Sequence, residues 1–277
     1  MNVIEQFIEA KTGAAETCED GIAVNDYFAA AIDGVTNKSG FSFQSKSPGR
    51  IAMELIKEAV LDLNPEIGAE AALENINRHI RDWYKDKGFL EEMRLKKEER
   101  CGASLVLFSD FRKELWFVGD CQALVNGESI HPQKQADRIF SDLRALIIHA
   151  ELAQGKTEEE LLQYDTSRER ILDLLKLQTK LQNTSHNSEF SYNIIDGFDW
   201  EPARGLRVVP LNKPQGEIVL ASDGYPRLFP GLAETEAALA DLLREDPLCY
   251  RQYRSTKGRY GGNVSFDDRC YIRFTYR

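Results

Sequence analysis

Apolar runs of strand length alternate along the chain with longer stretches that have the periodicity of amphipathic helices. Strand patterns occupy residues 2–10, 22–32 and 104–125, and they return after residue 190. Two helical stripes fill 47–88, and two more follow in the second half of the chain. This order predicts an α+β fold, a four-layer α-β-β-α sandwich in which two antiparallel sheets face each other and helices cover the outer faces.

Individual signals set the expected boundaries. The runs at 104–108, 115–118 and 123–125 predict a meander of antiparallel strands that ends at the hairpin signal Asn126-Gly127. Further strands are expected at 190–195, 206–211 and 217–221, then a helix at about 234–244 and a last strand from Cys270.

Residues 135–182 are helical by pattern and separate two groups of strands. The run Thr157-Glu158-Glu159-Glu160 is typical of a capping box at the start of the second helical stretch. The acidic motifs are spread from residue 20 to residue 268, so they meet only if the intervening chain folds as one unit. We therefore expect one domain over 1–277, with a helical insertion at about 135–182 that shapes substrate access.

Candidate chemistry gathers where the strands end. The apolar run 28–32 stops at Asp33-Gly34, a similar run stops at Asp223, and Asp267 precedes the last strand. Gly34 lacks a Cβ, so it can turn the backbone sharply and place its own carbonyl beside the Asp33 carboxylate. Carboxylate and carbonyl oxygens together suit a hard divalent cation. Taken singly, each Asp-Gly pair is more often a tight turn than a metal ligand.

Composition narrows the classes of partner. The 277 residues carry a formal net charge of −10, which disfavours binding to nucleic acid. No stretch has the length and apolar character of a membrane span, so we expect a cytoplasmic protein without a membrane partner. Five cysteines without paired spacing predict neither a zinc site nor a disulfide framework. A basic run, Arg251 to Arg259, is more commonly a solvated loop than a rim that attracts phosphate.

The acidic motifs, taken together, resemble one known family. In chain order they are Glu19-Asp20, Asp33-Gly34, Gly102-Ala103-Ser104, Gly119-Asp120, Ser222-Asp223-Gly224 and Asp267-Asp268. In that order the sequence is similar to the protein phosphatase 2C family, the metal-dependent serine/threonine phosphatases, as a divergent bacterial-type member. The resemblance spans nearly the whole chain, and it implies the same four-layer sandwich and a hydrolase that dephosphorylates a phosphoprotein substrate in signalling.

The resemblance also implies a set of metal ligands. Asp33 would bridge two ions, the Gly34 carbonyl would bind one of them, and Asp223 and Asp267 would complete the other. Asp120 would contribute to a weaker third position. All-oxygen ligation points to Mg²⁺ or Mn²⁺ as the cofactor, as two ions with a possible third.

The expected catalytic residues are Asp33, Asp20 and Glu19. By resemblance, Glu19 and Asp20 would orient metal-bound waters. Two ions about 3.5–4 Å apart activate a water for attack on a phosphate monoester, so no protein nucleophile is required.

The sequence departs from the family where substrate phosphate is gripped. Ala15 stands where an arginine is common, and Lys11 is the nearest cation and therefore the tentative phosphate ligand. Val35 replaces a histidine that some members have, and Cys121-Gln122 replaces Ser-Arg. We therefore expect weak binding of small phosphate esters. The main alternative is a catalytically weak relative that acts as a regulatory binding module; a purely structural domain is the third.

Overall fold

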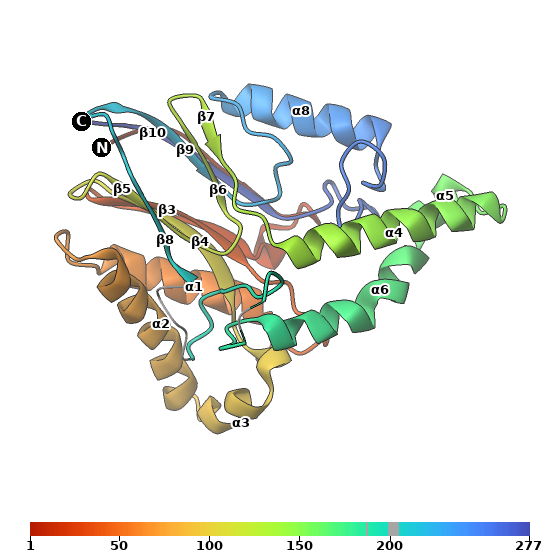
Figure 1. Ribbon diagram of the computed structural model, residues 1–277, viewed down its shortest axis with the longest axis horizontal. Coiled ribbons are helices and arrows are strands. Elements are labelled where there is room, and N and C mark those ends of the chain that lie inside the picture. The colour runs from red at the N-terminus through yellow and green to blue at the C-terminus, as the bar shows by residue number, and fades with distance from the viewer. Residues whose placement is uncertain (187, 199–204) are drawn as a thin grey trace.

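The computed structural model describes residues 1–186, 188–198 and 205–277. Two antiparallel five-stranded sheets pack face to face, with helices α1 (Pro48–Leu61) and α2 (Ala69–Asp86) outside one and α8 (Leu232–Glu245) outside the other (Figure 1). The predicted four-layer sandwich is therefore confirmed.

The sheets combine strands from distant parts of the chain. One has the order β1 (Asn2–Glu9), β10 (Arg269–Tyr276), β9 (Gly216–Ala221), β6 (Gln122–Val125) and β7 (Glu128–Ile130). The other has the order β2 (Asp20–Val24), β3 (Phe28–Gly34), β4 (Ala103–Ser109), β5 (Glu114–Val118) and β8 (Arg207–Pro210). The first and last strands of the chain thus pair with each other, and β1 is an edge strand.

The alternation of side chains along β3 shows how the layers form. Phe28, Ala30 and Ile32 pack toward α1 and α2, whereas Ala29 and Ala31 face the gap between the sheets. The gap is filled by apolar side chains from both sheets, among them Val106, Phe108, Phe117, Ile218, Leu220, Ile272 and Phe274. Burying each of the larger ones contributes about 1.5–3 kcal/mol, so this central layer holds the two sheets together.

Helix α1 lies directly on the β2–β3 hairpin. Ser47 caps it by accepting a hydrogen bond from the Arg50 amide at 3.3 Å, and Pro48 occupies the first helical position. A Cβ at Gly21 would lie 2.5 Å from the Met53 sulfur, so the glycine makes room for that side chain. Short helix α3 (Leu90–Leu95) follows α2.

The predicted meander at 104–125 is wrong. Strands β4 and β5 pair in one sheet, but β6 joins the other, so the chain crosses the sandwich at Gly119-Asp120. Gly119 has a φ of +83°, a conformation that favours glycine, and a Cβ there would clash with the Ser104 hydroxyl at 2.2 Å. Alternation of apolar and polar residues predicts each strand, but it does not predict which sheet the strand joins.

The predicted strand at 190–195 is also wrong. Only single bridges form there, between Ile195 and Ala103 and between Tyr192 and Gln182. The Asn183 side-chain amide exchanges two hydrogen bonds of 3.0 Å with the backbone of Ile194. An asparagine side chain thus takes the place of a neighbouring strand.

The helical stretch at 135–182 extends from one end of the sandwich (Figure 1). It comprises α4 (Gln135–Ala153), α5 (Glu158–Gln163) and α6 (Thr166–Leu177), and Thr157 and Glu160 form the predicted capping box.

Three further expectations concern the chain as a whole. That residues 1–277 form one domain stays a prediction. All five cysteines are buried and free, as expected for small core residues. None of the described helices has the length and apolarity that crossing a bilayer requires.

One buried arginine ties this helical segment to the C-terminal part of the chain. Arg144 on α4 donates to Asp165 at 2.7 Å, and also to the carbonyls of Leu248 at 2.8 Å and Ser255 at 3.1 Å. Its side chain is fully buried. The guanidinium therefore satisfies several buried acceptors from three separate segments at once.

We predict that Arg144→Ala lowers the free energy of unfolding by about 3–5 kcal/mol, because it leaves the Asp165 carboxylate buried without a cation. Arg254→Ala is the matched control, since it breaks a half-exposed pair with Asp142, also on α4, and should cost less than about 1 kcal/mol. Urea unfolding measures both values. Equal losses in the two variants would contradict the role given to Arg144.

Candidate active site

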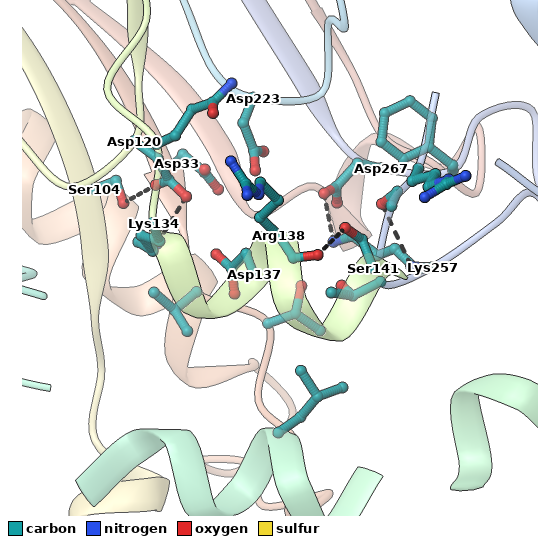
Figure 2. Close-up of a pocket in the computed structure, with 18 of the residues that line it drawn as sticks. Asp33, Ser104, Asp120, Lys134, Asp137, Arg138, Ser141, Asp223, Lys257 and Asp267 are labelled. Atoms are coloured by element: carbon teal, nitrogen blue, oxygen red, sulfur yellow. Dashed lines mark hydrogen bonds and ion pairs between the residues drawn. The ribbon is translucent and has the colours of Figure 1, made fainter. Parts of the chain in front are cut away.

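Five acidic residues line one cavity of about 250 Å³, namely Asp137 on α4 and four aspartates at strand ends. Asp33 ends β3, Asp120 lies at the crossing between the sheets, Asp223 follows β9 and Asp267 precedes β10. Figure 2 shows their side chains around the cavity, with α4 running past them. The cavity also includes Gly34. All five residues predicted as metal ligands are thus brought together.

Strand register explains the position of the acidic pair Asp20 and Asp33. They are direct partners across the β2–β3 ladder. Ile22 and Ala31, two positions inward on each strand, face the gap between the sheets. Because side chains alternate, both carboxylates lie at the end of that gap. A Cβ at Gly34 would lie 2.5 Å from two backbone oxygens, so only glycine permits this close approach.

Asp33 and Asp223 carry charge that the described residues leave unpaired. Neither carboxylate has a hydrogen bond or ion pair within the described ranges. Burial raises the pKa of Asp33 well above its usual value, and repulsion from Asp223 and Asp20 adds to this shift. Burial, together with Asp120 and Asp267, raises the pKa of Asp223 to about 7. Both sites therefore favour a bound proton or cation.

Asp120 and Asp267, in contrast, each have a lysine partner. Lys134 lies 2.8 Å from the Asp120 carboxylate, which also accepts a 2.6 Å hydrogen bond from Ser104. Burial alone would raise the pKa of Asp120, but Lys134 and Ser104 together lower it below its usual value. Lys257 forms an ion pair with Asp267. Two of the predicted ligands are thus already neutralised by ammonium groups.

Glu19 and Lys11 belong to a neighbouring network. Glu19 accepts hydrogen bonds of 2.7 Å from the hydroxyls of Thr36 and Ser47. The Lys11 ammonium lies 3.0 Å from Asp268 and 3.5 Å from Glu19. Lys11 does not line the cavity, so the phosphate contact predicted for it would require the side chain to leave these partners.

The donor set fits a hard divalent cation in its chemistry. One oxygen of the Asp20 carboxylate is buried without a hydrogen-bond partner, and Asp33 and Asp223 are unpaired at the cavity. In the described part of the chain, however, no three His, Cys, Asp or Glu side chains already converge closely enough to hold a metal ion. Binding would therefore draw the carboxylates closer together.

The basic residues of the cavity were not predicted as a group. Lys38, Lys134, Arg138 and Arg168 line it, and none belongs to a motif in the sequence. The basic run near the C-terminus is divided by the fold. Arg254 and Lys257 face the cavity, whereas Arg251 pairs with Glu158 on α5. The run was thus the one signal in the sequence for a basic rim.

Neither a family model nor a curated protein matches the sequence. Among solved structures, the chain is similar to the serine/threonine phosphatase PstP/Ppp of Mycobacterium tuberculosis (14% identity, 100% of this chain and 99% of that chain, TM-score 0.48). It is also similar to the catalytic domain of PstP in complex with 2 manganese ions (13%, 100% of each chain, TM-score 0.48). RsbX in complex with magnesium is a third (12%, 98% and 96%, TM-score 0.44). At this level of similarity, neither activity nor ligands are carried over to this chain.

We predict that the metal-free protein loses stability as the pH rises from about 4 to 7. The raised pKa of Asp223 means that the folded state holds a proton that the unfolded state releases, so this contribution is present below pH 4 and lost through pH 7. A shift of this size corresponds to on the order of 4 kcal/mol. Urea unfolding at pH 5 and pH 8 should show a smaller loss for Asp223→Asn than for the wild type. Equal losses would contradict the assignment.

Proposed function

We propose that the protein is a metal-dependent hydrolase of phosphate monoesters, and more narrowly a phosphoprotein serine/threonine phosphatase that uses two Mg²⁺ or Mn²⁺ ions. The observation that carries this proposal is the distribution of charge in one cavity. Unpaired Asp33 and Asp223 carboxylates face the same space as several basic side chains. Such a cavity suits a cation and a phosphate bound together.

Asp33, Asp223, Asp267 and the Gly34 carbonyl are the groups that would hold the two ions, and Asp120 would serve a third. When bound, the ions supply an activated water and neutralise charge on the phosphate. Binding at Asp267 requires Lys257 to give up its ion pair with this carboxylate.

The remaining acidic residues would position water. The hydroxyls of Thr36 and Ser47 fix the orientation of the Glu19 carboxylate, which keeps its charge directed at one place. Asp20 keeps one buried carboxylate oxygen without a partner, and this oxygen can accept a hydrogen bond from a water. These contacts support the roles that the motif resemblance implies for both residues.

A regulatory binding module is the second candidate, and a specific observation favours it. Lys134 and Lys257 already neutralise two of the proposed ligands. A module of this kind would bind a phosphorylated partner without hydrolysing it. Hydrolysis of an aryl phosphate by the purified protein, with and without Mn²⁺, separates the two candidates.

We predict that Asp33→Asn lowers Mn²⁺ affinity and aryl phosphate hydrolysis by more than about a hundredfold, because it removes the proposed bridging charge. The variant should remain folded, since the change also relieves repulsion among buried carboxylates. Calorimetric titration with Mn²⁺ and initial rates give the two values.

Asp173→Asn is the matched control, because this aspartate on α6 is almost fully exposed and far from the motif residues in sequence. It should leave both values unchanged. Unaltered Mn²⁺ binding in Asp33→Asn would refute the assignment of Asp33 as a metal ligand. If hydrolysis were nevertheless lost, Asp33 would act only in the chemical step.

A further inference from the structure

The cavity contains uncompensated positive charge as well as uncompensated negative charge. Six basic side chains line it: Lys38, Lys134, Arg138, Arg168, Arg254 and Lys257. Three of them pair with carboxylates, namely Lys134, Arg254 and Lys257. For the other three, the described residues provide no carboxylate within ion-pair distance of 4.0 Å. An anion is the ligand that these three side chains lack.

Lys38 is the clearest of the three. It lies in the loop between β3 and α1 and is half-buried, yet its ammonium has no hydrogen bond or ion pair among the described residues. Burial lowers the pKa of Lys38 to about 8. The surrounding cations Arg168, Lys134 and Lys257 act in the same direction, and Asp137 opposes them. A desolvated ammonium among other cations is unfavourable until an anion joins it.

Arg168 faces the same cavity from α6. One of its nitrogens donates to the Thr256 carbonyl at 2.7 Å, which fixes the guanidinium in place. Burial and the nearby Arg144 lower the pKa of Arg168 below its usual value, so its charge is also poorly compensated. The guanidinium keeps further donors for a ligand, and its planar shape matches two oxygens of a phosphate.

The residues expected to hold phosphate are placed elsewhere. Ala15 is exposed in a single 3-10 turn and does not line the cavity. Lys11 does not line the cavity; its ammonium pairs with Asp268 and Glu19, and lies 3.9 Å from the cavity residue Asp267. The Arg50 guanidinium reaches this turn and donates to the Ala15 and Cys18 carbonyls at 3.0 Å, but Arg50 does not line the cavity either.

We propose that Lys38 and Arg168 bind the phosphoryl group of the substrate and replace the arginine that is absent at position 15. This inference rests on the proposed function for its substrate, but the anion site itself does not depend on hydrolysis. A dianionic phosphate would accept hydrogen bonds from both side chains while facing Asp33 and Asp223 across the same cavity. Helix α6 lies in the segment that the sequence predicts to shape substrate access, and it would thereby also contact the reacting group.

Binding of inorganic phosphate tests this site directly. Isothermal titration with phosphate, in EDTA and then with Mn²⁺, compares the wild type with Lys38→Met and Arg168→Met. Each variant should bind phosphate about ten- to a hundredfold more weakly, as expected for the loss of one charge-assisted contact. In active protein, KM for an aryl phosphate should rise by a similar factor, with a smaller change in kcat.

Substitution of one nearby lysine and one nearby arginine by methionine provides the matched controls. Lys46→Met lies in the same loop as Lys38 but pairs with Glu54 outside the cavity, and Arg170→Met lies on α6 and pairs with Glu151. Both should bind phosphate like the wild type. Circular dichroism tests whether each variant is folded. If Arg168→Met does not fold, the phosphate affinity of Lys38→Met alone decides whether the anion site exists.

The outcomes separate this inference from the proposed function. Loss of phosphate binding in Lys38→Met, in a protein that hydrolyses no aryl phosphate, supports the anion site and refutes the phosphatase. Hydrolysis with unchanged phosphate affinity and KM in both variants overturns the anion site alone. A wild-type protein that binds no phosphate in either condition overturns it as well.

Discussion

Repulsion among carboxylates at one end of the inter-sheet gap is the constraint on which the site depends. Asp20, Asp33 and Asp223 are crowded there, and burial raises the pKa of each above its usual value. Such a group is stable only when protons, ammonium groups or metal ions neutralise it. Lys134 and Lys257 neutralise neighbouring members of the cluster, and the remaining negative charge is what the proposed metal ions would neutralise.

The sandwich produces this crowding through simple geometry. Side chains that alternate along β3 and its neighbours fill the gap between the sheets with apolar groups, and the pattern ends where the carboxylates begin. Close approach of the backbone requires glycine at two places. Gly34 lies against the start of α1, and Gly119 turns the chain from one sheet into the other. The same packing that stabilises the fold therefore holds the acidic residues together.

Much of this was predictable from the sequence, and the limits have physical causes. The period of two located β3 and β9, and the Asp-Gly endings identified Asp33 and Asp223. The same alternation could not show that β6 joins the other sheet, because apolar side chains cover both faces of each sheet, as Ala123 and Leu124 do on β6. No sequence motif marks Lys38 or Arg168 as a ligand-binding residue. Both line the same cavity only because of the way α6 packs. The strand expected at 190–195 failed because the Asn183 side chain supplies the hydrogen bonds of a strand partner.

The contacts of Arg144 have a mechanical consequence for the cavity. The acidic wall is built on the sheets, whereas most of the basic wall belongs to α4, α6 and the C-terminal loop, which Arg144 binds into one unit. Lys134 and Lys257 tie that unit to the acidic wall through their ion pairs with Asp120 and Asp267. A ligand that took over either carboxylate would thus also release one of the attachments between the two walls.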